Sequence, residues 1–220
     1  MFTDRKDAAL KLAKALEKYK DKNAVVLGIP RGGAETAYYV ALYLNAELSL
    51  LVSRKLGHPG NPEYAFGAIA EDGSIYFNPA AKRELSEESI HAVVDEQKEE
   101  IERRIKILRK GKPLPVLKGR TVILVDDGIA TGATILAAIE LCKKRNAGKI
   151  IIAAPVSGYD MEDTLGKMAD EVVILEKPAD YYAVSQAYQS FYNLSDEDAL
   201  EFMERWDREK GGLKDSSLKR

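Results

Sequence analysis

The chain alternates short apolar runs with longer segments in which apolar residues recur at helical spacing. The apolar runs are continuous, as strands buried on both faces require, and they lie at residues 24–29, 47–52, 121–125, 149–154 and 171–175. Helical spacing predicts helices at 4–20 and 34–44, and further helical segments separate the later runs. Strands joined by helices indicate an α/β protein with a Rossmann-like parallel sheet flanked by helices.

Residues 53–77 do not fit this alternation. They begin as a loop rich in glycine, proline and charge and continue as a hairpin that turns at residues 71–73. A long helix is predicted over residues 86–109, with Ser86 as its N-cap and acidic residues in its first turn.

Composition narrows the class of protein. A chain of 220 residues with 45% hydrophobic residues is consistent with one domain over residues 1–220. The 33 basic residues are balanced by 35 acidic residues, which argues against a nucleic-acid partner and favours a small polar ligand. One cysteine excludes an internal disulfide, and no apolar run has membrane length, so we expect a cytoplasmic protein without a membrane partner.

The segment TVILVDDGIATGAT, residues 121–134, changes abruptly from a strand to two carboxylates and then to a loop of small and hydroxyl residues. In parallel sheets, ligands bind beyond the carboxyl ends of the strands. Gly128 and Gly132 permit unusual turns and close approach of a ligand, and the amides of residues 131–134 lie at the predicted start of a helix. This loop therefore predicts a site for a phosphate monoester.

Asp126 and Asp127 require a partner of their own. At about 5 Å and an effective dielectric near 20, two carboxylates repel by roughly 3 kcal/mol, so hydroxyl donors or a divalent cation must offset the repulsion. A vicinal diol with magnesium nearby would do so, which indicates a phosphorylated ribose with a second phosphate group. The alternative is an ordinary acidic turn that ends the strand and caps the helix.

The whole string VILVDDGIATGAT resembles the signature of the type I phosphoribosyltransferase family. The resemblance implies transfer of phosphoribose from phosphoribosyl pyrophosphate to a nitrogen nucleophile, a nucleobase, with release of pyrophosphate. It implies that Asp126 and Asp127 contact the ribose hydroxyls and hold Mg²⁺ directly or through water, and that Asp127 is also catalytic. The family's phosphate loop corresponds here to Gly128, Ala130, Thr131, Gly132, Ala133 and Thr134.

Two other loops have counterparts in the family. GIPRGG, residues 28–33, occupies the place of the pyrophosphate loop, with Arg31 supplying charge and Gly32 and Gly33 exposing amides, and the resemblance predicts a cis peptide near Arg31. Residues 53–77 correspond to the flexible catalytic loop, in which Arg54 and Lys55 would neutralise charge on the leaving pyrophosphate. The alternatives are a plain turn for PRGG and a solvated basic pair for Arg54 and Lys55. His58 is a candidate for proton transfer, although a histidine in a polar loop is commonly a surface residue.

The last segment, residues 177–220, would contribute to a small hood over the site. Its aromatic residues would either stack on a planar base or pack the segment against the sheet, and they are Tyr181, Tyr182, Tyr188 and Phe191. This segment and the loop RKLGHPGNPE resemble an uncharacterised phosphoribosyltransferase group. Ala130 replaces the aspartate of the hypoxanthine and guanine branch, so the resemblance argues against that branch and leaves the base open.

Two alternatives from other classes remain at this stage. Members of the same fold bind phosphoribosyl pyrophosphate and regulate transcription without catalysis, and the basic stretch 103–120 would then contact nucleic acid. The tail 195–206 would otherwise dock on another chain, although Ser195 with Asp198 is sufficiently explained as a helix start. We expect an enzyme that forms a homodimer.

Overall fold

The computed structural model describes residues 1–217, with side chains described for all of these except 62–63 and 211–217. The main sheet has five parallel strands in the order β2-β1-β6-β7-β8. The strands are β1 (Val25–Gly28), β2 (Glu47–Leu50), β6 (Thr121–Val125), β7 (Lys149–Val156) and β8 (Glu171–Glu176). The α/β class that the hydrophobic pattern predicted is therefore confirmed.

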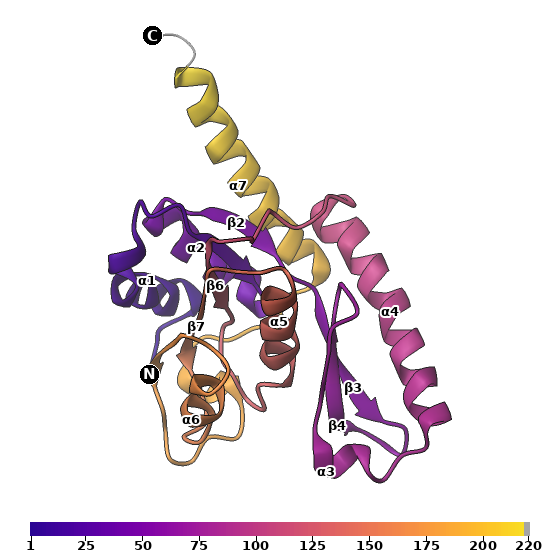
Figure 1. Cartoon of the computed structure of the whole chain (residues 1–220). Helices are drawn as coiled ribbons and strands as arrows, with labels where there is room; N and C mark the ends of the chain where they lie inside the picture. The colour runs from indigo at the N-terminus through magenta and orange to yellow at the C-terminus, as the bar shows by residue number, and fades with distance from the viewer. Residues whose placement is uncertain (218–220) are drawn as a thin grey trace.

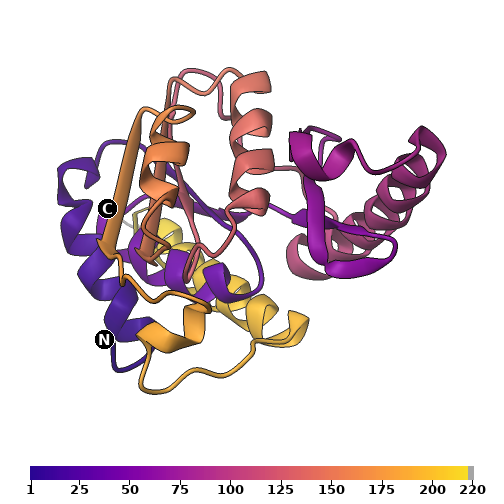
Figure 2. The same ribbon diagram turned by 90° about the horizontal axis from the view of Figure 1, so that it is seen from below.

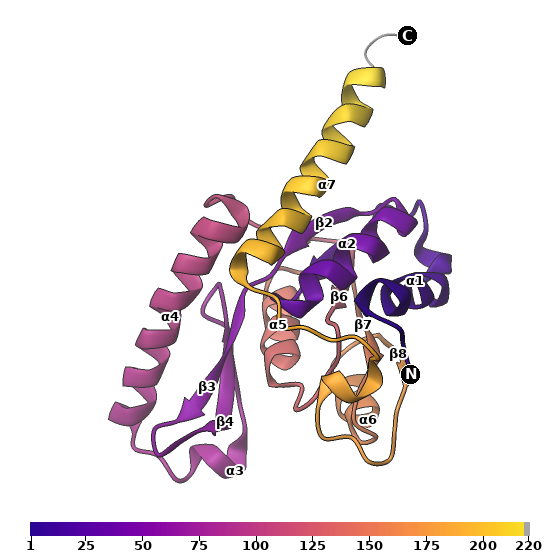
Figure 3. The same ribbon diagram turned by 180° about the vertical axis from the view of Figure 1, so that it is seen from behind.

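Helices cover both faces of the main sheet (Figures 1 and 3). Side chains alternate along each strand, so Val26 and Ile123 pack with the helices of one face, whereas Val25 and Val122 pack with the helices of the other. The first face carries α1 (Arg5–Ala15), the short 3₁₀ turn η1 (Glu17–Tyr19) and α2 (Gly32–Leu44), and the second carries α5 (Ala133–Lys144) and α6 (Met161–Gly166).

A separate unit, which we call the arm, comprises residues 53–109. It contains an antiparallel sheet of β3 (Ser53–His58), β4 (Asn61–Ala70) and β5 (Ile75–Phe77), followed by α3 (Pro79–Lys82) and α4 (Glu87–Arg109). Figure 2 shows the arm beside α5 and outside the main sheet. Ala68 and Ala70 of β4 pack in the same apolar cluster as α5, which joins the arm to the rest of the molecule.

The predictions for the arm are confirmed in part. β4 and β5 pair across the expected turn at residues 71–73, and Ser86 caps α4 by accepting a hydrogen bond from the N–H of Ser89 at 3.2 Å. The prediction that the region begins as a loop is wrong. Residues 53–58 form β3, because their backbone pairs with β4 in a hairpin whose turn contains Pro59 and Gly60.

The C-terminal part of the chain begins with irregular backbone that contains the 3₁₀ turn η2 (Val184–Ala187) and continues as α7 (Asp196–Ser217). α7 starts where the sequence predicted, because Ser195 and Asp198 bond reciprocally: the N–H of Asp198 donates to Ser195 Oγ and the N–H of Ser195 to Asp198 Oδ2. α7 packs on α2 and α4 and then extends away from the sheet (Figure 1). Residues 218–220 of the predicted 177–220 segment lie outside the described residues.

Among residues 1–217, no helix is both long and apolar enough to cross a bilayer.

Candidate active site

Three connections leave the main sheet at the same edge. Gly28 at the end of β1 is in register with Leu50 of β2 and with Val125 of β6. The loops that follow these strands therefore emerge side by side. This geometry brings together residues 28–33, the start of the arm and residues 126–134, as expected for the carboxyl edge of a parallel sheet.

The loop after β6 ends in a helix N-terminus suited to an anion. Gly132 precedes α5 with a φ of 69°, in the left-handed region that favours glycine. In the described part of the chain, the backbone N–H groups of residues 131–134 have no hydrogen-bond acceptor, and the hydroxyl groups of Thr131 and Thr134 have no partner. The arrangement matches the predicted phosphate cradle in its chemistry: free donors at the positive end of a helix dipole.

Gly128 has a different role from the one predicted. Its φ is not in the left-handed region, and a Cβ at this position would lie 2.4 Å from Cγ1 of Val184. Position 128 therefore requires glycine because Val184 of η2 packs directly against it, and not because a ligand approaches it.

The two adjacent carboxylates differ in their surroundings. Asp126 is partly exposed, and its Oδ1 accepts the backbone N–H of Asp127 at 2.8 Å. Burial, followed by the neighbouring charge of Asp127, raises the pKa of Asp126 well above its ordinary value of 3.8. Asp127 is 8% exposed and lies deeper.

Arg5 is the partner of Asp127, and the sequence pattern did not identify it. Arg5 is 3% exposed; its Nε donates to Asp127 Oδ2 at 2.7 Å, and its Nη1 donates to the carbonyl of Tyr192 at 2.8 Å. The guanidinium also lies 4.0 Å from the ring centroid of Phe191. The prediction that only hydroxyl donors or a cation would offset the aspartate pair is therefore wrong for Asp127, because Arg5 supplies the positive charge. Arg5 follows the N-cap of a surface helix, and only the tertiary fold reveals its partner 122 residues away.

Glu35 of α2 is a second residue that the sequence did not identify. It is 7% exposed, and its Oε2 has no hydrogen-bond partner within the described residues. Burial raises the pKa of Glu35, Arg5 opposes this effect, and the charges of Asp4 and Asp127 add to it. The carboxyl group of Glu35 therefore lies close enough to Arg5 and Asp127 for their charges to affect its pKa.

The GIPRGG loop packs tightly against the aspartates. The peptide bond between Pro30 and Arg31 is cis, so the cis peptide predicted near Arg31 is confirmed. A Cβ on Gly32 would lie 1.9 Å from Asp127 Oδ2, and one on Gly33 would lie 2.7 Å from the carbonyl oxygen of Val125. Glycine at these two positions therefore allows β1 and β6 to present their loops in contact.

Two cavities meet at Arg31, whose side chain is exposed. The hood cavity has a volume of about 410 Å³, and its lining residues include Arg5, Gly32, Asp127, Ser185, Phe191 and Asn193. The arm cavity has a volume of about 560 Å³, and its lining residues include Pro30, Ser53, Arg54, Lys55, Gln97, Arg104 and Thr134. The fold thus brings the predicted Arg31, Arg54 and Lys55 to one cavity that also reaches Thr134 of the cradle.

The side chains of Arg54 and Lys55 on β3 differ in their bonding and exposure. The Nε of Arg54 donates to Oε1 of Gln97 at 2.9 Å, whereas Lys55 is exposed. Burial lowers the pKa of Arg54, and the charges of Arg104 and Arg31 lower it further. His58 also lines the arm cavity, and its Nδ1 accepts the N–H of Gly60 at 3.1 Å within the hairpin turn.

The aromatic residues of the C-terminal segment mostly pack the protein. Tyr188 is 6% exposed, clusters with Phe2, and donates its hydroxyl to the carbonyl of Asp127 at 2.5 Å. Tyr182 is 83% exposed. Phe191 is the member of this group that lines the hood cavity.

Several arginines of the basic stretch 103–120 lie in ion pairs. Arg109 is 6% exposed and pairs with Glu71 at 2.6 Å, and Arg120 pairs with Glu47 at 2.6 Å. Arg103 pairs with Glu100 and Asp196, each at 2.7 Å. The charges of these three arginines are therefore already paired within the protein, which weakens the case for a nucleic-acid contact through them.

The donor set fits magnesium only as an ion shared with a ligand. The part of the chain that the structure describes has no group of three or more His, Cys, Asp or Glu side chains able to hold a metal. Asp127 already bonds Arg5, so Asp126 is the freer carboxylate. Mg²⁺ is commonly bound by one or two carboxylates together with substrate phosphates and water, and this site fits that mode.

Comparison with known proteins agrees with the geometry. Residues 4–190 match the phosphoribosyl transferase domain family, and the chain belongs to this family. A Mycobacterium tuberculosis protein provisionally named a phosphoribosyl transferase is 42% identical over 211 residues, which are 95% of this chain and 48% of that protein. The chain thus spans about half the length of the curated relatives that it matches most extensively.

Two further similarities concern the fold and a shorter stretch of sequence. The crystal structure of the protein TT1426 from Thermus thermophilus superposes with a TM-score of 0.80 at 37% identity, covering 93% of this chain and 98% of that chain. An adenine phosphoribosyltransferase from Mycoplasmopsis agalactiae is 39% identical over 64 residues, which are 28% of this chain and 38% of the relative.

Proposed function

We propose that the chain transfers phosphoribose from phosphoribosyl pyrophosphate to a nitrogen nucleophile, a nucleobase, and releases pyrophosphate. The observation that carries this proposal is the convergence, at one sheet edge, of unpaired amides at the start of α5, the carboxyl of Asp126 and the basic arm cavity. These groups have the chemistry to bind a monophosphate, a sugar diol and a diphosphate, respectively.

In the reaction, the nucleophile's nitrogen, which has lost its proton to solvent, forms a bond to the anomeric carbon as the bond from that carbon to the pyrophosphate oxygen breaks and the pyrophosphate leaves with that electron pair. The amides of residues 131–134 bind the 5′-phosphate, and Asp126 orients the ribose hydroxyls, which together fix the anomeric carbon. Arg54 and Lys55 stabilise the negative charge that develops on the leaving pyrophosphate. Asp126 would hold Mg²⁺ together with a bound diphosphate, and the ion would supply further charge neutralisation.

Asp127 has a changed role in this proposal. Its buried pair with Arg5 makes it a positioning residue that fixes the loop and the floor of the hood cavity. The hood cavity, with Phe191 and the polar Asn193 in its wall, is the proposed site for the acceptor base.

A non-catalytic regulator that binds phosphoribosyl pyrophosphate is the alternative. The presence of Arg54 and Lys55 at the arm cavity favours the enzyme, since a sensor has no leaving group to stabilise. A calorimetric titration with phosphoribosyl pyrophosphate and magnesium, followed by turnover assays with a panel of nucleobases, distinguishes the two.

Binding together with pyrophosphate release for one base supports the enzyme. Binding without turnover, accompanied by nucleic-acid affinity that falls steeply with salt, supports the regulator. Absence of binding contradicts both functions.

A further inference from the structure

Arg104 of α4 lines the arm cavity together with Pro30 and Arg31 of the GIPRGG loop and has no part in the function proposed above. The residue is 8% exposed, so its charge is largely withdrawn from water. Such a charge requires compensation from specific partners.

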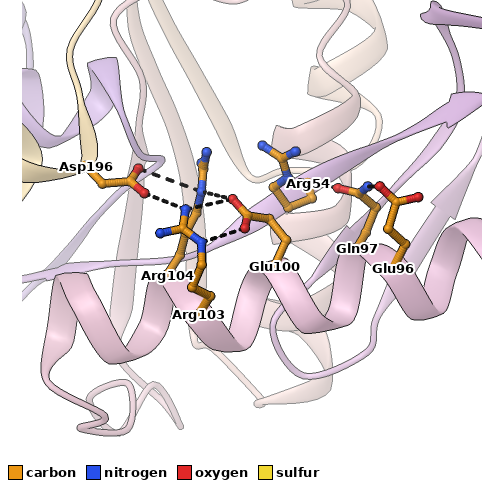
Figure 4. A network of polar contacts seen from close by, with 7 residues as sticks. All are labelled: Arg54, Glu96, Gln97, Glu100, Arg103, Arg104 and Asp196. Atoms are coloured by element: carbon orange, nitrogen blue, oxygen red, sulfur yellow. Dashed lines mark hydrogen bonds and ion pairs between the residues drawn. The ribbon is translucent and has the colours of Figure 1, made fainter.

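The partners of Arg104 compensate only one side of its guanidinium. Its Nε donates to Glu100 Oε1 at 2.9 Å and lies 3.8 Å from Asp196 Oδ1. Figure 4 shows Asp196 on one side of the two neighbouring arginines and Glu100 on the other. None of the hydrogen bonds among residues 1–217 uses the two terminal nitrogens of Arg104, which leaves a fork of donors directed away from α4 (Figure 4).

The lining of the cavity includes two further polar groups, Ser53 and Arg54. Ser53 is 3% exposed, and its hydroxyl has no hydrogen-bond partner within the described residues, although Ser53 lines the cavity. The guanidinium of Arg54 is held in position by α4. Its Nε donates to Gln97, and Gln97 donates in turn to Glu96 at 3.4 Å. Two guanidinium groups and a buried hydroxyl therefore face one space.

The charge of the lining identifies the kind of ligand. The described lining contains four basic side chains, Arg31, Arg54, Lys55 and Arg104, and one carboxylate, Glu96. Guanidinium groups match the paired oxygens of phosphate, and several of them around one cavity favour an anion of high charge over a single phosphate.

We infer that Arg104 is a pyrophosphate-binding residue, which with Ser53 forms an inner wall of the diphosphate site on α4 and β3. This inference rests on the proposed function for its choice of ligand. It goes beyond that function by assigning the diphosphate a contact on the long helix of the arm, held in place by Glu100.

Arg103 provides a matched control. It is the next residue on α4 and shares Glu100 and Asp196 as partners, yet it does not belong to the cavity lining. Replacing either arginine with glutamine removes one positive charge from the same ion-pair network, and only the replacement of Arg104 removes a donor fork from the cavity.

The test is calorimetric titration of the full chain with inorganic pyrophosphate in the presence of magnesium. Arg104→Gln is expected to weaken binding about tenfold or more, as for loss of a charged hydrogen-bonding group, whereas Arg103→Gln changes it less than about threefold. Arg104→Lys keeps the charge without the fork and is expected to lie between the wild type and Arg104→Gln. Each Arg104 replacement should weaken the binding of orthophosphate less than the binding of pyrophosphate.

Thermal unfolding of each variant verifies that it is folded, and Arg104→Lys carries the test if Arg104→Gln does not fold. Equal losses in the Arg103 and Arg104 variants, or no loss in the Arg104 variants, would overturn the assignment. Pyrophosphate binding is measured without any acceptor base, so the result for Arg104 is independent of whether turnover is found. Conversely, turnover with Arg104→Gln at unchanged pyrophosphate affinity would refute Arg104 and leave the proposed function intact.

Discussion

At the scale of single residues, the adjacent Asp126 and Asp127 have different surroundings and different proposed roles. Asp127 forms a buried ion pair with Arg5, whereas Asp126 accepts the backbone N–H of Asp127, and its pKa is raised by burial and by the nearby Asp127 carboxylate. The sequence assigns both to the ribose hydroxyls and Asp127 to catalysis as well, and it predicts that replacing Asp126 and Asp127 with asparagine weakens ligand binding while leaving the melting temperature nearly unchanged. The structure separates them, because only Asp127 lies in a buried ion pair.

Asp126→Asn should stabilise the protein at neutral pH. The raised pKa means that the folded chain retains the proton at higher pH than the unfolded chain does. The charged carboxyl is therefore unfavourable for folding above its folded pKa, and this penalty disappears below the ordinary value of 3.8. We expect a melting temperature higher than that of the wild type at pH 7, by roughly 2–4 °C for each kcal/mol recovered, and a difference that vanishes near pH 3.

Thermal unfolding from about pH 3 to pH 8 measures this effect. A stability difference independent of pH would show that the carboxyl is not desolvated. The same variant should bind phosphoribosyl pyrophosphate more weakly, so stability and binding would change in opposite directions.

Gly32→Ala tests the contact between the two loops. A Cβ would lie 1.9 Å from Asp127 Oδ2, so the carboxylate must move and the Arg5 pair must distort. We expect a loss of about 1–3 kcal/mol, as for overpacking. Gly166→Ala is the control, since a Cβ there meets no atom within 4 Å and should leave stability nearly unchanged. Urea unfolding compares them, and equal stability of the two variants would contradict the predicted clash.

At the scale of elements, the start of α7 determines where the C-terminal segment meets the arm. Ser195 and Asp198 cap the helix reciprocally, and the next residue after Ser195 is Asp196, which bonds Arg103 of α4. The capping residues therefore position a carboxylate as well as ending the irregular segment. A capping box in the sequence predicted the helix start, although the arginine partners 92 and 93 positions earlier were not predictable from it.

Ser195→Ala should destabilise the protein by about 1 kcal/mol, because the N–H of Asp198 loses its acceptor. Ser190→Ala is the matched control, since Ser190 is exposed in the preceding irregular segment and its replacement should change stability by less than about 0.5 kcal/mol. Urea denaturation of both variants measures the difference. Identical midpoints would mean that the cap does not contribute to stability.

At the scale of the whole molecule, a buried ion pair within the arm holds a hydrogen bond to the end of β2 in the main sheet. Arg109 at the end of α4 pairs with Glu71 at 2.6 Å and donates to the carbonyl of Leu50 at 3.1 Å, while Glu71 accepts the N–H of Val52. Both side chains of the pair are at most 7% exposed. The position of Arg54 and Arg104 relative to the cradle thus depends on a contact outside the proposed site.

Glu71→Ala should lower the free energy of unfolding by about 3–5 kcal/mol, since it leaves the charge of Arg109 buried without a partner. Arg109→Met added to Glu71→Ala should recover part of that loss, because no unpaired charge remains. A double-mutant cycle by urea unfolding measures the coupling. Additive losses from the two replacements would contradict a direct ion pair.

The sequence by itself determined the parallel sheet and the order of its helices and strands, and its signature predicted a phosphate loop; the resemblance to a family added the cis peptide near Arg31. These features follow from local periodicity and from a signature contained in a few consecutive residues. The tertiary structure alone decided that Arg5 neutralises Asp127, that Val184 requires Gly128, that residues 53–58 form a strand and that Arg104 reaches the arm cavity. The physical reason is that the contacts of Arg5, Gly128 and Arg104 join residues far apart in the chain, and burial and charge pairing across such distances leave no periodic trace in the sequence. The strand at 53–58 depends instead on backbone pairing with the adjacent β4, which its sequence rich in glycine, proline and charge did not indicate.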